Sequence, residues 1–122
     1  MDVSLRSDHL VQIVVEPGAL VTLSNVKAQI EAIGQLNNGQ RYPVLIISGK
    51  DTTVQTDVMN YVAQKNSNPF ALAEGYLLTS ISHKLLANFY LKFNHPVRPT
   101  RFFTNEQDVV QWLYPFRTNQ GN

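Results

Sequence analysis

The chain contains no cysteine, which excludes disulfide bonds, thiolate metal sites and a cysteine nucleophile. It also lacks the run of about 18 apolar residues that a membrane-spanning helix requires. The N-terminal residues 1–6 include an early acid, and no apolar segment of about 7 to 15 residues, typical of a signal peptide, follows them. These absences predict a cytoplasmic protein that is stabilised by packing alone and has no membrane partner.

The chain also has no excess of charge of either sign. Ten lysine and arginine residues against nine aspartate and glutamate residues give a net charge of +1. Such a chain has no bulk attraction for nucleic acid, so we expect no nucleic-acid partner. Only the segment between Glu74 and Glu106 departs from this balance, because it contains basic residues and no acid.

The short motifs that mark common catalytic and nucleotide sites are missing. The glycines are isolated, so no Gly-x-Gly-x-x-Gly fingerprint exists, and segment 48–51 lacks the residues that would complete a phosphate-binding loop. There is no Gly-x-Ser-x-Gly elbow for a serine nucleophile. His9, His83 and His95 are too far apart in the sequence to form a local metal site. We therefore predict a protein that is not an enzyme and that has no metal and no cofactor.

What is present is enough apolar sequence for one compact domain. The 122 residues are 43% hydrophobic, and we expect a single domain over residues 1–116 with a flexible C-terminal tail at 117–122. The run 42–49 contains four consecutive apolar residues, Val44 to Ile47, between a proline and a Ser-Gly turn. A strand of this kind needs cover on both faces, so this run is predicted to be the central strand of a sheet with helices on each side.

The remaining patterns predict an α/β fold. A hairpin is expected around Ser7-Asp8, and three- and four-residue apolar spacings indicate amphipathic helices. A short helical turn is expected over 70–73. The predicted order is β-β-α-β-α-β-α-β-α, with a mixed five-stranded sheet and right-handed parallel crossovers. The expected strands cover 2–6, 9–16, 42–49, 75–79 and 98–103, and the expected helices begin near residues 23, 54, 80 and 104.

Several hydroxyl residues lie where helices are expected to begin. Thr22 or Ser24 is predicted to cap the first helix, and Thr53 the second. Thr104 and Gln107 fit the spacing of a capping box at the start of the last helix.

Three of the expected strand ends could together bind a small anion. Ligands of open α/β sheets bind beyond the carboxyl ends of the strands, where helix N-termini present backbone N–H groups. The alternative is that these residues serve only as helix caps. The candidate residues are Ser48, Gly49, Lys50, Ser80, Ser82, His83, Lys84 and Thr104.

The helix expected from residue 80 has an apolar stripe that covers nearly half of its circumference. Leu86, Tyr90 and Phe93 lie at the margin of this stripe. They form either an interface with a partner, including a second copy of this chain, or part of the core against a neighbouring helix.

The element order and several sequence segments resemble the STAS fold of bacterial anti-sigma-factor antagonists, and in particular small bacterial STAS-like proteins that are mostly uncharacterised. The matching segments are 17–18, 26–27, 30–32, 42–45, 87–91, 99–106 and 112–113. STAS antagonists dock on a partner protein, and phosphorylation at the start of the helix after the central strand switches the docking. The resemblance therefore implies Thr53 or Thr56 as a phosphoacceptor, and the alternative is that Thr53 is only a helix cap.

Two functions are predicted from these observations. The first is a non-enzymatic regulatory or protein-interaction module of STAS-like type that binds a protein partner or forms a homodimer. The second is a domain that binds a small molecule, either an anion at the strand ends or an apolar molecule between the sheet and the helix expected from residue 80. A wide internal pocket would favour the second function, and a filled core with an exposed aromatic patch would favour the first.

Overall fold

The computed structural model describes residues 2–62, 64, 68–79 and 98–119. The helix expected from residue 80 lies outside the described residues, as do the candidate residues that it carries.

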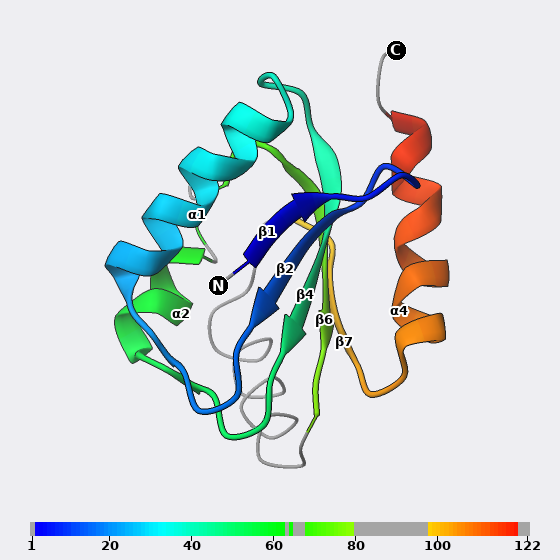
Figure 1. Ribbon diagram of the computed structural model, residues 1–122. Helices are drawn as coiled ribbons and strands as arrows, with labels where there is room; N and C mark the ends of the chain where they lie inside the picture. Colours follow the sequence, from blue (N-terminus) through cyan, green and yellow to red (C-terminus); the bar gives the residue numbers. More distant parts are fainter. Residues whose placement is uncertain (1, 63, 65–67, 80–97, 120–122) are drawn as a thin grey trace.

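The centre of the molecule is a mixed five-stranded sheet with the spatial order β1-β2-β4-β6-β7 (Figure 1). β1 pairs with β2 in antiparallel fashion, and each of the other neighbouring pairs is parallel. The α/β class and the mixed five-stranded sheet predicted from the sequence are thus confirmed. The strands are β1 (Asp2–Leu5), β2 (Val11–Val15), β4 (Tyr42–Ser48), β6 (Ala71–Leu77) and β7 (Thr100–Phe103).

Helices cover both faces of this sheet. α1 (Leu23–Leu36) and α2 (Thr56–Val62) lie on one side and α4 (Glu106–Leu113) on the other (Figure 1). The central strand β4 serves both sides, because Val44 and Ile46 belong to the core cluster under α1 and α2, whereas Leu45 packs with the buried residues of α4. The prediction that both faces of this strand are covered is confirmed.

The ends of the first helix follow from local hydrogen bonds. Thr22 is the N-cap of α1, where its side chain accepts from the backbone N–H of Asn25, and the Asn25 side chain accepts from the N–H of Thr22. At the other end Gly39 has a positive φ of 77° and donates to the carbonyl of Gly34. This left-handed residue, which favours glycine, closes the helix.

A second, two-stranded parallel sheet corrects the start of the second helix. β3 (Leu20–Val21) pairs with β5 (Thr53–Val54), and α2 begins only at Thr56. Thr53 is therefore a strand residue and does not cap the helix as predicted. The physical reason is that the Thr53 N–H donates to the carbonyl of Ala19 at 2.9 Å and the Gln55 N–H to the carbonyl of Val21 at 3.3 Å, which keeps this segment extended.

The helical turn predicted over 70–73 is also wrong, because β6 already begins at Ala71. Pairing with β4 on one side and β7 on the other holds this segment extended, with an irregularity in the β4–β6 register between Tyr42 and Val44. Gly75 permits close packing of α4 on β6. A Cβ atom at Gly75 would lie 2.6 Å from Cγ2 of Val109, so a larger residue would push the helix away.

The last helix is capped one residue later than the sequence suggested. Asn105 is the N-cap of α4, and its side chain accepts from the N–H of Asp108 at 3.2 Å. Thr104 is exposed and lies before the cap. Thr104 followed by Gln107 fits a capping box, but Asn105 with its extended φ and ψ supplies the same acceptor one position closer to the helix.

The ordered C-terminal region extends past the boundary predicted at residue 116. α4 continues into a 3-10 helix, η1 (Tyr114–Asn119). Within it Arg117 donates from Nη1 to the backbone carbonyl of Asp8 at 2.8 Å and lies 3.9 Å from the centre of the Tyr114 ring. Arg117 is thus part of the folded domain and not of a loose tail, because the β1–β2 turn binds it.

Candidate functional site

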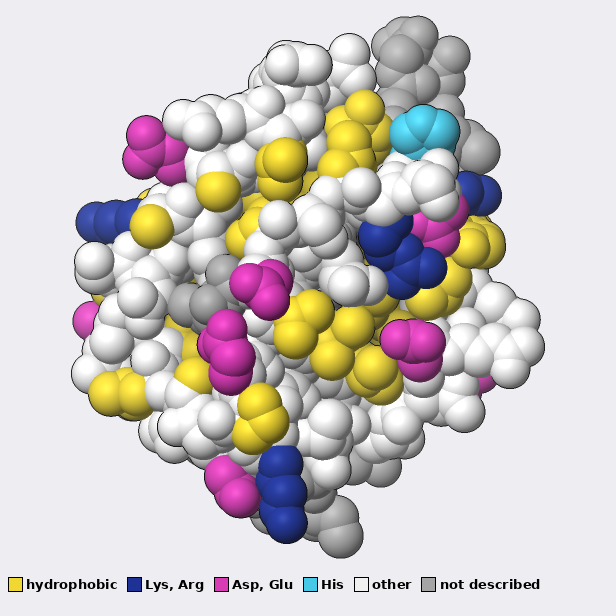
Figure 2. Space-filling view, in the orientation of Figure 1, with side chains coloured by type: hydrophobic (Ala, Val, Ile, Leu, Met, Phe, Trp, Pro, Cys, Tyr) yellow, Lys and Arg dark blue, Asp and Glu magenta, His cyan; other side chains and the backbone are white. Residues whose placement is uncertain are grey.

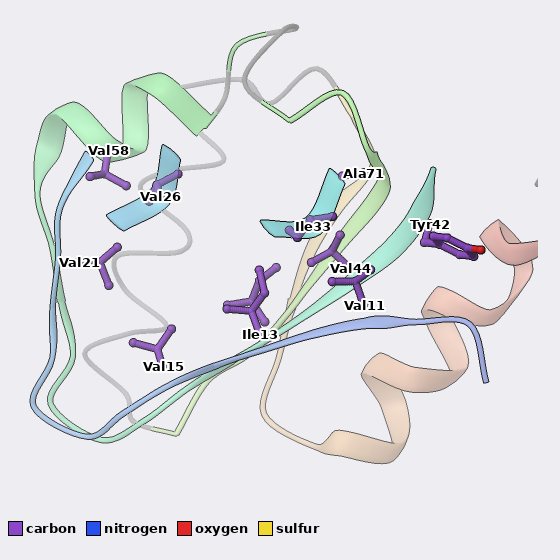
Figure 3. Close-up of a cluster of buried hydrophobic side chains, with 11 residues drawn as sticks. Val11, Ile13, Val15, Val21, Val26, Ile33, Tyr42, Val44, Val58 and Ala71 are labelled. Atoms are coloured by element: carbon purple, nitrogen blue, oxygen red, sulfur yellow. The ribbon is translucent and has the colours of Figure 1, made fainter. Parts of the chain in front are cut away.

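A cavity of about 170 Å³ lies on the face of the sheet that α1 and α2 cover. Its walls come from strands β2, β4, β6 and β7 of the main sheet, from the paired β3 and β5, and from both helices. Val15, Val21, Val26 and Val58 converge on this region of the core in the close-up of Figure 3.

The apolar walls of the cavity follow from the alternation of each strand and the periodicity of each helix. In β2 the buried residues alternate with less buried ones, which places Ile13 and Val15 on the same face. Val26 and Ile33 are the buried residues of α1 and are seven positions apart, so they lie on one side of that helix. The result is a space bounded mainly by branched aliphatic side chains.

Glu74 is the only charged side chain among the described residues that line the cavity. Its strand β6 places it on the cavity face of the sheet, and the residue is only 6% exposed. Arg98 Nη1 donates to Glu74 Oε1 at 2.9 Å, and both side chains of this ion pair are 8% exposed. A buried carboxylate with one specific cationic partner is a feature typical of functional sites, although structural ion pairs share it.

Arg98 joins three parts of the fold. In addition to Glu74 it binds the backbone carbonyl of Val62 through Nη1 at 2.9 Å and that of Gln64 through Nη2 at 3.1 Å. A cation at the C-terminal end of a helix is stabilised by the helix dipole and by the carbonyls that the helix leaves unpaired. The guanidinium therefore holds the end of α2 and Glu74 in fixed relative positions next to the cavity.

The environment of Glu74 favours the protonated acid more than water does. Burial raises the pKa of Glu74 above its ordinary value, and the charge and hydrogen bond of Arg98 oppose this rise only in part. Among the residues that the structure describes, Arg98 is the only donor to this carboxyl group, and the bond goes to Oε1. No described residue donates a hydrogen bond to Oε2.

The predicted anion site is placed only in part. Ser48 lines the cavity, but the Gly49 N–H donates to the carbonyl of Val15 at 2.8 Å and is thus already bonded. Lys50 and Thr104 are exposed, and the first turn of α4 carries the acids Glu106 and Asp108, which disfavour an anion there. The other residues predicted for this site, Ser80, Ser82, His83 and Lys84, lie outside the described residues.

The remaining predicted sites have different outcomes. Thr53 is exposed in β5, and Thr56 is the first residue of α2. The interface residues Leu86, Tyr90 and Phe93 lie outside the described part of the chain.

Within the described residues no group of three or more His, Asp or Glu side chains is placed to hold a metal ion. None of the helices in that same part is both long and apolar enough to cross a bilayer.

A second polar cluster joins the two ends of the described chain. Arg6 binds both carboxylate oxygens of Asp8 at 3.0 Å, and the Tyr114 hydroxyl donates to Asp8 Oδ2 at 3.0 Å. Burial raises the pKa of Asp8, but the hydrogen bonds from Tyr114 and Arg6 and the Arg6 charge outweigh it and hold the pKa below its ordinary value.

On the face seen in Figure 2, acidic and basic side chains are interspersed and no large patch of one sign is visible.

Sequence reasoning missed the Glu74–Arg98 pair. The available signal was a single acid within the apolar segment 70–78, which no amphipathic pattern explains. Its partner is 24 residues away, too far for any local spacing rule to connect the two.

The fold and cavity together define an α/β domain with a mixed five-stranded sheet, an apolar cavity under two helices and a buried ion pair at its wall. The chain belongs to the family described as Domain of unknown function (DUF7793), whose family model matches residues 3–117. It is similar to a protein of unknown function from Arthrobacter sp. FB24 with a known crystal structure, at 26% identity over 92% of this chain and 97% of that chain, with a TM-score of 0.34. No curated protein matches the chain.

Proposed function

We propose that this protein is a non-enzymatic binding domain that holds a small, largely apolar molecule in the cavity between the sheet and helices α1 and α2. The observation that carries this proposal is the cavity itself, with its volume of about 170 Å³ and its aliphatic walls. An engineered apolar cavity of roughly 150 Å³ in another protein binds benzene, so the space is large enough for a ring.

The chemistry of the walls supports an apolar occupant. Ligand sites are typically concave and mostly apolar with a few polar groups, and removal of apolar surface from water favours binding.

The second candidate function is a STAS-like regulatory module in the cytoplasm, which docks on a protein partner or on a second copy of this chain. The mixed five-stranded sheet supports it, since such a sheet is part of the order on which the resemblance to STAS-like proteins was based. The described order differs by the added strands β3 and β5, and the third expected helix lies outside the described residues. In such a module Thr53 or Thr56 would be the phosphoacceptor. The two functions are separable by what the purified protein carries.

The test is native mass spectrometry of the protein purified from its own host under gentle conditions. We expect one bound small molecule for each chain. The Val26→Phe variant places a larger side chain into the cavity from α1, so it should lose the bound mass and stay folded. The matched control is Val110→Phe, because Val110 is partly buried on α4 across the sheet from the cavity, and this variant should keep the bound mass.

Two outcomes would contradict ligand binding. The first is a wild-type protein without any bound small molecule, and if such a protein is a dimer or a complex with another chain the STAS-like module becomes the better interpretation. The second is a bound mass that persists in Val26→Phe, because the molecule would then occupy another place.

A further inference from the structure

The wall of the cavity carries a carboxylate oxygen to which no described residue donates. Glu74 faces the cavity, and its Oε1 is bound by Arg98 at 2.9 Å, whereas its Oε2 receives no hydrogen bond from the described residues. A ligand in the cavity can therefore bring a donor to Oε2 without displacing Arg98.

The charge of Arg98 decides which kind of donor fits. Arg98 is not among the residues that line the cavity, so it lies behind Glu74 and already balances the carboxylate. A ligand with an ammonium group would add a second buried cation to a neutral pair, and a ligand with a carboxylate would meet a like charge. Both arrangements carry the high desolvation cost of an unbalanced buried charge. A neutral donor avoids it.

A hydroxyl group meets the requirement in either protonation state of Glu74. It donates to a carboxylate oxygen and accepts from a protonated carboxyl group, which an N–H donor without a lone pair does not do. The aliphatic walls leave space for about one ring beside this group.

Resting on the function proposed above, we infer that the natural ligand is a neutral hydroxyl compound, an alcohol or a phenol, whose hydroxyl group binds Glu74 Oε2 and whose apolar body fills the space toward Val21 and Val58. Because of the Glu74–Arg98 pair, the cavity then binds hydroxyl compounds more tightly than hydrocarbons of the same shape.

The experiment compares phenol with toluene, which have similar shapes and differ in a hydroxyl in place of a methyl group. Binding of each to the full chain, freed of co-purified molecules, is measured by protein-observed NMR titration near neutral pH, with benzylamine as the cationic probe. We expect phenol to bind about tenfold more tightly than toluene, as one hydrogen bond to a carboxylate allows. Benzylamine should bind more weakly than either.

Glu74→Gln tests whether the carboxylate causes the preference. The bond from Arg98 requires an oxygen, so the amide nitrogen of Gln would face the cavity and donate to the phenol oxygen in a neutral hydrogen bond. The preference for phenol should therefore fall below tenfold without vanishing, because the bond to a carboxylate is lost. The double variant Glu74→Leu and Arg98→Met replaces the buried ion pair by apolar side chains, which neither donate nor accept, so its preference for phenol should fall to about equality with toluene.

The outcomes separate the inference from the proposed function. Binding of phenol and toluene with equal affinity to the wild type, or a preference for phenol that persists in the double variant, would overturn the hydroxyl inference and leave the cavity as a binding site. Failure of all three probes to bind would overturn the proposed function as well.

Discussion

Glu74 is the one charged side chain on the described wall of the cavity, and its titration should be visible in the stability of the whole protein. Burial raises its pKa, while in the unfolded chain the group titrates at about 4.3. The folded protein therefore binds this proton more tightly. The stabilisation is fully present below about pH 4.3 and is lost as the pH rises through the raised pKa of the folded state.

We thus expect the urea midpoint of the wild type to fall relative to that of Glu74→Gln as the pH rises above about 4.3. Glutamine does not titrate, so it removes this contribution and keeps the bond to Arg98. Asp8 acts in another range, since its lowered pKa gives stability above about pH 3.9 that is lost as the pH falls through the folded pKa. Parallel curves for wild type and variant would contradict the raised pKa of Glu74.

At the scale of the residue, the sequence predicted side-chain contacts only between residues that are a few positions apart. Thr22 was among the predicted caps because hydroxyl residues before an apolar period indicate a helix start, and the structure confirms it. The partner of Glu74 is 24 residues away and is brought to it by the sheet. No periodicity encodes such a contact, so the ion pair required the structure.

At the scale of the element, the start of α4 provides a sharp test, because two adjacent polar residues compete for the capping role. Asn105 accepts from the N–H of Asp108, whereas Thr104 is exposed and precedes the cap. Asn105→Ala should lower the free energy of unfolding by about 1 kcal/mol, as the loss of an N-cap does. Thermal and urea midpoints measure this loss.

Thr104→Ala is the matched control for this cap. It removes a polar side chain of similar size one residue away and should leave the midpoints nearly unchanged. A larger loss for Thr104→Ala than for Asn105→Ala would restore the capping box that the sequence suggested.

The elements that the sequence predicted well are those with a long, distinct apolar pattern. The central strand β4 has an uninterrupted apolar run and the helix α1 has apolar spacings of three and four residues, and both agree with the structure. β3 and β5 are two residues each, which is too short for any period to appear, so their pairing was missed and α2 was predicted to begin too early. The short apolar run that begins β6 fits a helix or a strand, and only its pairing with β4 and β7 decides between them.

At the scale of the whole molecule, two cores lie on opposite sides of one sheet, and they differ in how completely side chains fill the space. The cluster under α4 is close-packed, as Gly75 shows, whereas the cluster under α1 and α2 contains the cavity. The alternation of strand residues predicts that both faces are apolar. It does not predict which face leaves space, because that depends on side-chain volumes summed across elements far apart in the sequence.

The C-terminal 3-10 helix also acts at this scale, because it fastens the end of the fold to its first turn. Arg117 binds the carbonyl of Asp8 and lies over the Tyr114 ring, and the Tyr114 hydroxyl binds the Asp8 carboxylate, so residues 106 positions apart are joined. Ending the chain after Phe116 removes the contacts of Arg117 and should cost about 1 to 2 kcal/mol of stability. Arg117→Ala in the full chain should cost a similar amount, measured by the urea midpoint. If the shortened chain were as stable as the full one, the domain would end at residue 116 and the contacts of Arg117 would contribute nothing to its stability.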